Sequence, residues 1–318
     1  MAYKPGDRAI YLNRKSFSAP AASQGSPTFS ILLFFIIFIS STQLHAGNLW
    51  TEKLLGEALV TTSNDKEVVW LDENGWQIFS LYKESPRSDL QGGVILLHDV
   101  GTHPDWPQII APLRQRLTQS GWNTLSLMMP SFDDNQDDNE SLQWLYVDSE
   151  KRITSAINHF QNKNVLNIVI VAHGHSASVA AHYLSQQPAD SVRALVGIGF
   201  TTRPEQPGAW QDVASSLSKL QIPVLDIYGE LDNPDVLRGA NSRLEAAQRS
   251  GRANPTQTSP QRTVKVRQLA WKKTQNLGYR QLNITGADHY FSKQQDRLIN
   301  QIDGWLRVYA QGQEIQTK

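Results

Sequence analysis

The feature of this sequence that most constrains its fold is a series of short apolar runs that alternate with segments of helical periodicity. The clearest run is Asn167–Ala172 (NIVIVA), and Gly93–Leu97 (GVILL) is similar. Continuously apolar runs of this length are typical of strands covered on both faces. The intervening segment Trp106–Ser120 spaces its apolar residues three or four positions apart, which predicts a helix. The sequence therefore predicts an α/β fold with a mostly parallel central sheet and helices on both faces.

The other elements follow from the same patterns. A β-hairpin is expected to open the sheet, because the apolar segments Glu67–Trp70 and Trp76–Tyr82 flank an Asn-Gly turn. Further strands are predicted over Thr124–Met129, Ala194–Gly199, Val224–Tyr228 and Arg280–Thr285. Further helices are predicted over about Tyr146–Gln161, Ser176–Ser185 and Gln294–Tyr309.

The N-terminal segment has the layout of a secretory signal peptide. Ile31–Ile39 is an unbroken apolar run, basic residues precede it, and a small residue, Ala46, stands at the expected cleavage point. The run is shorter than the roughly 20 residues that a membrane-spanning helix needs. We therefore predict a signal peptide over residues 1–46, a single domain over 47–318, and a periplasmic or secreted protein. The alternative is an uncleaved anchor, because the polar stretch before the apolar run is long.

Charge and cysteine content exclude several classes of function. The formal net charge is zero, and since residues 1–46 hold four basic residues against Asp7, the remainder is mildly acidic. A mildly acidic body without a basic stripe argues against a nucleic-acid partner. The absence of cysteine excludes disulfides, thiolate metal sites and a cysteine nucleophile. We expect a small-molecule or envelope-derived ligand, no membrane span in the mature chain, and no cofactor; the sequence does not indicate a protein partner.

Polar residues directly follow four of the predicted strands. They are His98–Gly101, His173–Ala177, Gly229–Asp232 and Gly286–His289. Ligand sites in open parallel sheets form beyond the carboxyl ends of the strands. The sequence therefore predicts one functional edge that contains all four segments.

The order of these segments resembles the α/β-hydrolase fold, in which a nucleophile, an acid and a histidine follow one another along the chain. The resemblance implies that Asp232 is the acid, that His289 is the base, and that the backbone around Asp99 and Val100 lies in the oxyanion region. The stretches His98–Pro130, Pro223–Asp232 and Gly286–Leu306 also resemble a family of exported bacterial proteins. That family, catalogued as domain of unknown function 3530, is assigned to the α/β-hydrolase group. The similarity covers most of residues 50–312 and implies no particular substrate.

The nucleophile has two interpretations. Gly174–Ser178 can be aligned as a variant of G-x-S-x-G with Ser176 as the nucleophile. Alternatively, Gly174 occupies the elbow between strand and helix, and no side chain stands at the point of attack. We favour the second alignment, because Ala177 and the apolar positions that follow it would then face the sheet. Ser176 would lie in the first turn of the helix, where we expect its hydroxyl to cap the helix.

Other residues are given structural interpretations. Five histidines lie on the predicted edge, but they lack metal-site spacing such as H-E-x-x-H, so we predict hydrogen-bonding roles and no metal. These are His98, His103, His173, His175 and His289. The acidic loop over residues 131–140 lacks the calcium-binding pattern and is predicted to be solvated. Asp226 is predicted to be a structural hydrogen-bonding residue, and Asp235 is the reserve acid. Packing roles are predicted for Trp106, Trp122, Trp144 and Trp305.

These features support competing functions. One is a serine hydrolase acting on an ester, thioester or amide through Ser176, Asp232 and His289. Another is a degenerate hydrolase that has lost its nucleophile, or a non-catalytic protein that binds an envelope ligand or partner. A metal-assisted hydrolase is the third. The fold alone does not separate them.

The first testable prediction concerns processing. Export should remove residues 1–46, so N-terminal sequencing of the protein from the cell envelope should begin at Gly47 or a close neighbour. A protein recovered from the cytoplasm that begins at Met1 would contradict export.

Overall fold

The computed structural model describes residues 49–63, 66–73, 75–131, 139–187, 191–201, 212–252 and 278–311. The predicted signal peptide and its cleavage point lie outside the described residues, as does most of the acidic loop. All described residues belong to one compact unit, His45–Lys318.

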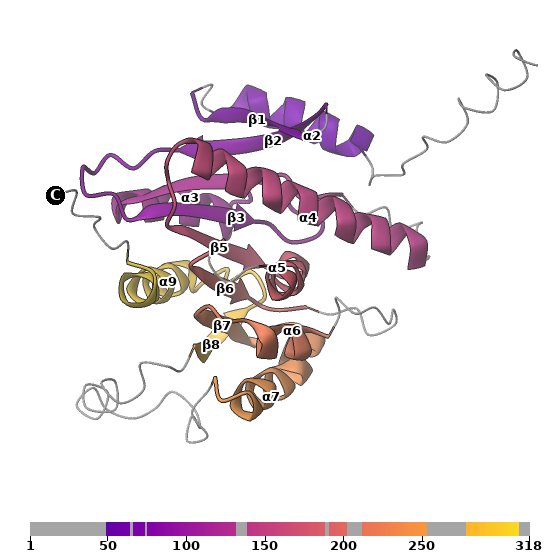
Figure 1. Ribbon diagram of the computed structural model, residues 1–318, viewed down its shortest axis with the longest axis vertical. Helices are drawn as coiled ribbons and strands as arrows, with labels where there is room; N and C mark the ends of the chain where they lie inside the picture. Colours follow the sequence, from indigo (N-terminus) through magenta and orange to yellow (C-terminus); the bar gives the residue numbers. More distant parts are fainter. Residues whose placement is uncertain are drawn as a thin grey trace, which may run out of the picture. The chain divides into compact units, whose positions relative to one another are not determined.

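Eight strands form one sheet in the order β1-β2-β4-β3-β5-β6-β7-β8 (Figure 1). The strands are β1 (Val68–Glu73), β2 (Trp76–Lys83), β3 (Gly92–Leu97), β4 (Trp122–Leu127), β5 (Ile168–His173), β6 (Ala194–Ile198), β7 (Val224–Leu231) and β8 (Tyr279–Asp288). β1 and β2 form the predicted antiparallel hairpin, and Gly75 adopts a φ of 89° in its turn. β2 pairs antiparallel with β4, and every later pair is parallel.

Helices cover both faces of the sheet. They are α2 (Leu49–Thr62), α3 (Ile110–Gln119), α4 (Asn139–Asn162), α5 (His175–Gln186), α6 (Val213–Lys219), α7 (Pro234–Arg249) and α9 (Gln295–Tyr309). Alternate residues of the central strands point to opposite faces. Ile95 and Ile170 join the core that contains residues of α4 and α5, whereas Val94 and Val169 join the core that contains residues of α3 and α9 (Figure 1). The predicted fold class is therefore confirmed.

Two long helices, α2 and α7, were not predicted from the sequence. In α7 the buried face contains Arg243, which interrupts the apolar pattern, although Pro234 at the first turn is a typical start signal. In α2 the large apolar residues Trp50 and Leu54 are exposed, while Glu52 is buried in an ion pair with Arg152. In each helix a charged side chain is buried by a partner that is distant in sequence, and in α2 this leaves no periodic apolar face.

Several boundaries differ from the predicted ones. α3 begins at Ile110 rather than near Trp106, β4 begins at Trp122, and α4 extends back to Asn139. Trp122 and Trp305 are buried packing residues, as predicted. The side chain of Trp144 lies outside the described residues.

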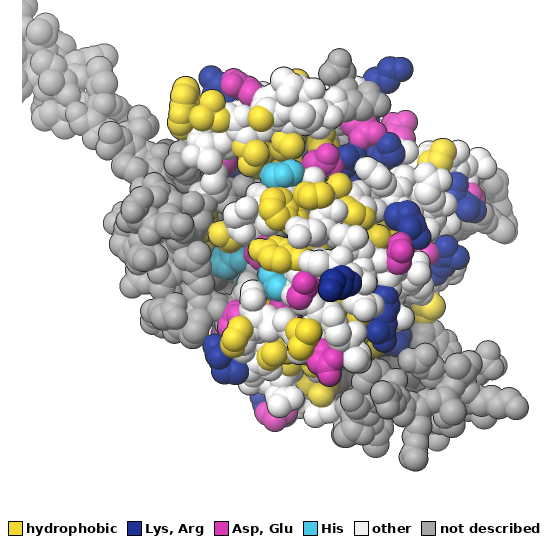
Figure 2. Space-filling model, turned by 180° about the vertical axis from the view of Figure 1, so that it is seen from behind, with side chains coloured by type: hydrophobic (Ala, Val, Ile, Leu, Met, Phe, Trp, Pro, Cys, Tyr) yellow, Lys and Arg dark blue, Asp and Glu magenta, His cyan; other side chains and the backbone are white. Residues whose placement is uncertain are grey.

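Charge is balanced on the face drawn in Figure 2. Lys and Arg side chains are interspersed with Asp and Glu around its margin, and hydrophobic side chains and histidines lie toward its middle. Within the described parts of the chain, no helix is both long enough and apolar enough to cross a membrane.

Asp226 has the structural role predicted for it. This fully buried carboxylate in β7 accepts hydrogen bonds from Arg243 Nε (2.7 Å), Tyr279 Oη (2.5 Å) and Gln281 Nε2 (3.0 Å). Burial and the Asp226 charge raise the pKa of Tyr279 well above its usual value, so the phenol remains a donor. The cluster ties α7 and β8 to β7, the strand that carries the acid of the candidate site.

We expect Arg243→Met to destabilise the protein by about 3–5 kcal/mol, because it leaves the buried Asp226 charge without its counter-ion. The matched control is Arg249→Met in the same helix, whose pair with Glu245 is exposed, and it should change stability by less than about 0.5 kcal/mol. Urea denaturation measures both values. Equal effects of the two substitutions would contradict this account.

Candidate functional site

The site lies where the strand order reverses. β3 pairs with β4 on one side and with β5 on the other, so a crevice opens between the carboxyl ends of β3 and β5. Leu97 of β3 is paired with Ala172 of β5. Asp99 and Gly174 each follow this pair by two residues, and they therefore lie side by side.

Gly174 occupies the turn between β5 and α5. Its φ is 59° and its ψ is −125°, a conformation open mainly to glycine. Its N–H donates to Ile198 O (2.8 Å), which joins the turn to the end of β6. The structure therefore has the alignment that places Gly174, not Ser176, at the elbow.

Ser176 lies in the first turn of α5 and faces the loop that follows β3. Its buried hydroxyl donates to His98 O (2.5 Å), and no side chain caps the start of α5. The predicted helix-capping role is therefore wrong. The hydroxyl bonds a carbonyl of the neighbouring loop because that loop packs directly against the first turn of the helix.

The Asp99 carboxylate fills the space beside Gly174. Oδ1 accepts from Val100 N (2.8 Å) and from His175 N (2.7 Å), and Oδ2 lies 3.0 Å from His289 Nε2. A Cβ atom added to Gly174 would overlap the Asp99 carboxyl group. The sequence predicted a role for the backbone at Asp99 and Val100, but it missed the side chain of Asp99, which occupies the position where an elbow residue's side chain would stand.

Asp232 and His289 form the predicted pair. His289 Nδ1 lies 2.6 Å from Asp232 Oδ1, and Asp232 also accepts from Gly229 N (3.0 Å) and Asn233 N (2.8 Å). These backbone bonds hold the carboxylate at the end of β7. The structure thus places Asp232, rather than the reserve candidate Asp235, against the imidazole.

His289 lies between two carboxylates and carries a positive charge. Each ring nitrogen faces a carboxylate oxygen, an arrangement that needs a proton on both nitrogens. Burial lowers the pKa of His289, but the hydrogen bonds and charges of Asp232 and Asp99 outweigh it and raise the pKa to about 9. Burial raises the pKa of Asp99, but His289 and the other donors outweigh it and lower the pKa to about 2.

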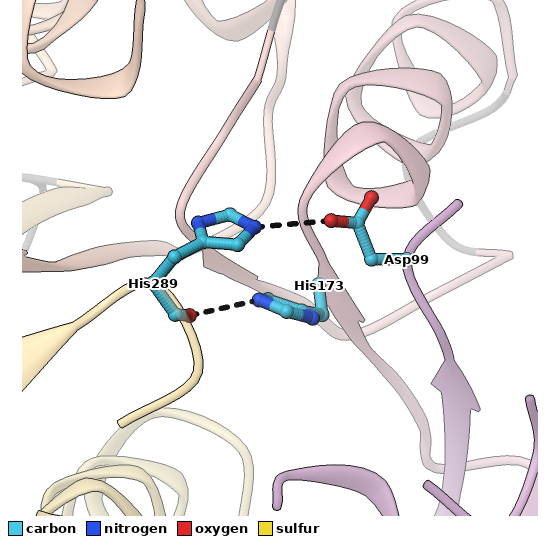
Figure 3. A group of neighbouring side chains, drawn as sticks. All are labelled: Asp99, His173 and His289. Carbon is cyan, nitrogen blue, oxygen red and sulfur yellow. Dashed lines mark hydrogen bonds and ion pairs between the residues drawn. The ribbon is translucent and has the colours of Figure 1, made fainter. Parts of the chain in front are cut away.

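His173, the last residue of β5, lies against His289. Its Nε2 donates to His289 O (3.1 Å), and the two ring centroids are 4.6 Å apart (Figure 3). Burial is the largest of the effects that lower the pKa of His173, so this ring is neutral. His173 is fully buried.

His98 is held in one tautomer by the backbone. Its Nε2 accepts from Met129 N (2.9 Å), so Nδ1 carries the hydrogen and faces Asp99 O (2.9 Å). Burial lowers the pKa of His98 to about 4, which agrees with a neutral ring. His103 is half-buried at the rim, where its Nδ1 accepts from Asp105 N (3.2 Å).

A metal ion is the alternative occupant of this cluster. Asp99, His173 and His289 each offer a ligand atom, and these atoms lie within 4.8 Å of one another. In the described arrangement both nitrogens of His289 are protonated and bonded to carboxylates. A metal between these residues would require His289 to lose a proton and its hydrogen bond to Asp99 to break. The short contact between Asp99 and His289 therefore fits a shared hydrogen bond better than a bound metal.

A pocket of about 200 Å³ opens beside Asp99. It lies among the loop after β3, the end of β4, and helices α2, α4 and α5. Its apolar walls include Leu55, Val100, Met128, Met129, Pro130 and Leu145. Asp99 is thus a charged residue in a lining whose surface is mostly apolar.

The fold and this arrangement define the chain as an α/β-hydrolase-fold protein with an acid and a histidine in place. Its sequence matches the family described as protein of unknown function (DUF3530) over residues 48–143 and 146–261, and the chain belongs to this family. The resemblance inferred from the sequence is therefore confirmed. A search of curated proteins found no match.

Similar solved structures support the same fold. Est1E from Butyrivibrio proteoclasticus is 12% identical, with a TM-score of 0.54 over 76% of this chain and 98% of its own. A dienelactone hydrolase from Anabaena variabilis is 18% identical, with a TM-score of 0.54 over 77% and 97%. An alpha-beta serine hydrolase homologue from Coxiella burnetii is 13% identical, with a TM-score of 0.52 over 76% and 97%. At these identities the similarity establishes the fold alone.

The charged state of His289 predicts a pH dependence of stability. A pKa of about 9 in the folded state exceeds the ordinary value of 6.5, so this stabilisation is complete below pH 6.5 and is lost as the pH rises through 9. The free energy of unfolding should fall by roughly 3 kcal/mol across this interval.

Urea denaturation at intervals between pH 6 and 10 measures this slope. His289→Gln should remove it, and His103→Gln should retain it, because the pKa of His103 is lowered below this interval. A slope that persists in folded His289→Gln would assign the effect to another group.

Proposed function

We propose that this chain is an exported, non-catalytic binding protein that keeps the α/β-hydrolase fold but has lost serine hydrolysis. One observation carries the proposal: the Asp99 carboxylate occupies the space beside Gly174, where the elbow nucleophile would stand. The apolar run Ile31–Ile39 and the small residue Ala46 support export.

The same carboxylate occupies the donors that an acyl substrate would need. Hydrolysis of an ester or amide requires backbone N–H groups aimed at the developing oxyanion. The N–H groups of Val100 and His175 are the candidates, and both already donate to Asp99 Oδ1. Asp99 therefore acts as an internal anionic occupant of the oxyanion region.

Asp99 is itself poorly suited to replace serine as the nucleophile. Its carboxylate is stabilised by two backbone donors and by His289, and such hydrogen bonds reduce its basicity. A covalent ester on Asp99 would also need a neutral histidine to activate water. His289 is protonated at neutral pH, since its pKa is raised to about 9. Asp232 and His289, which would support catalysis, are instead held in an ion cluster with Asp99.

Ser176 offers no substitute. Its proton is committed to His98 O, and the ring nitrogen that would take a proton, His289 Nε2, is bonded to Asp99. The acid and the histidine are retained by a chain that shares its fold with a protein named as a dienelactone hydrolase. We infer that the chain descends from an enzyme and that its former catalytic groups now shape a binding site.

Fluorophosphonate labelling tests this proposal, because the reagent needs an activated serine. We expect neither the wild-type protein nor Ser176→Ala to be labelled. Labelling of the wild type that Ser176→Ala abolishes would establish the serine-hydrolase function instead.

A rebuilt nucleophile provides the positive control. Gly174→Ser alone should be destabilised and unlabelled, because its side chain would overlap Asp99 and must adopt a positive φ. Asp99→Gly combined with Gly174→Ser removes the overlap. The new hydroxyl should reach the place of Asp99 Oδ2, which lies 3.0 Å from His289 Nε2. A folded double variant that is not labelled would show that Asp99 is not what blocks the nucleophile position.

A further inference from the structure

Several hydroxyl and N–H groups beside the pocket already donate their protons to other atoms of the protein, which leaves mainly acceptor atoms for a ligand. We propose that it binds a small primary amine with a compact apolar body, and that the Asp99 carboxylate receives the ammonium group. This inference rests on the proposed binding function and adds the chemical class of the ligand.

Three of the five hydroxyl groups around the pocket have committed their protons to the backbone. Ser149 Oγ donates to Leu145 O (2.8 Å), Ser176 Oγ to His98 O (2.5 Å), and Thr102 Oγ1 to Asp99 O (2.7 Å). Each hydroxyl has a single proton, so toward the pocket it presents only oxygen lone pairs. These three side chains favour a ligand that donates hydrogen bonds.

The backbone donors at the pocket are occupied in the same way. Met129 N donates to His98 Nε2, and Ser131 N donates to Glu52 Oε1 (2.7 Å). Val100 N and His175 N both donate to Asp99. An anionic ligand would therefore have to displace an existing hydrogen bond at each of these four positions.

Asp99 keeps acceptor capacity of its own. A carboxylate offers roughly four lone-pair positions. Two on Oδ1 are taken by the backbone N–H groups and one on Oδ2 by His289, which leaves one on Oδ2. Asp99 is one of the residues that line the pocket, and the proposal places the ammonium group at this remaining position of Oδ2.

The charges on both sides of the pocket favour a cation. On one side, Asp99 and Asp232 face the single positive charge of His289. On the other side, Glu52 and Asp148 both pair with Arg152, whose Nη1 also donates to Met128 O in the pocket wall. Each cluster keeps one uncompensated negative charge. Within the described part of the chain, no Lys or Arg lines the pocket.

Volume and wall composition set the size of the ligand. A cavity of about 150 Å³ with apolar walls holds benzene, and the pocket measures about 200 Å³. Met128 and Met129 in the wall adapt readily to the shape of a ligand. A single ring with a short aminomethyl arm, as in benzylamine, fits both the volume and the acceptor-rich end.

The test compares three probes of one shape by calorimetric titration near pH 7: benzylamine, benzyl alcohol and benzoate. We expect benzylamine to bind at least about tenfold more tightly than benzyl alcohol, because a hydrogen bond to a charged group exceeds a neutral one. Benzoate should not bind detectably. Binding of benzyl alcohol or benzoate as tight as that of benzylamine would overturn the proposal.

Three variants locate the binding. Asp99→Asn should weaken benzylamine at least about tenfold with little effect on benzyl alcohol. Thr51→Trp, at an exposed wall position on α2, should block all three probes while leaving the fold intact. Asp296→Asn is the charge control, since this residue is exposed on α9 and paired with Arg116. Unchanged benzylamine binding in folded Thr51→Trp would place the site elsewhere.

The binding and labelling experiments test the amine site and the loss of serine hydrolysis separately. If no probe binds while the protein remains unlabelled, the amine site is wrong and the loss of serine hydrolysis stands. If the wild type is labelled at Ser176 and also binds benzylamine through Asp99, the non-catalytic function is wrong and the amine site stands.

Discussion

The structure of the site depends on the contact between the Asp99 carboxylate and Gly174. A glycine at the elbow leaves a space on the inner side of the turn and two backbone N–H groups without a ligand. Asp99 fills that space and accepts from both N–H groups. Its second oxygen, Oδ2, forms an ion pair with His289. This contact holds Asp99 beside His289, and the hydrogen bonds of Asp232 and Asp99 together raise the pKa of His289.

In the proposed binding protein, Asp232 and His289 have a different physical role from that of a catalytic acid–base pair. In a hydrolase the imidazole must alternate between neutral and charged forms during each turnover. Here the two carboxylates stabilise the charged form, and the pKa of His289 rises to about 9. The pair therefore contributes to the stability of the folded state and to the electrostatic potential of the pocket. Other buried ion pairs join Asp226 with Arg243 in β7 and α7, and Glu52 with Arg152 beside the pocket.

The sequence predicted the elements that carry an apolar signal of their own. The central strands β3 and β5 and the helix α9 were identified because each needs a continuous or periodic apolar pattern to be buried. The helices α2 and α7 were missed because Glu52 and Arg243 are buried only through partners elsewhere in the fold. Local patterns do not contain such partners, so the buried charges could not be anticipated from periodicity alone.

For the site, the sequence and its resemblance to the α/β-hydrolase fold pointed to Asp232 as the acid and His289 as the histidine, and favoured Gly174 over Ser176 at the elbow. Strand order places Asp232 and His289 at one edge, and the positive φ at position 174 needs a residue without a side chain. The tertiary structure alone decided what fills the vacancy. Asp99 lies 75 residues before Gly174 along the chain, and only the parallel register of β3 with β5 brings its carboxylate to the elbow. Register and side-chain direction result from packing over the whole sheet, and for that reason the sequence could favour Gly174 at the elbow but could not show that Asp99 lies beside it.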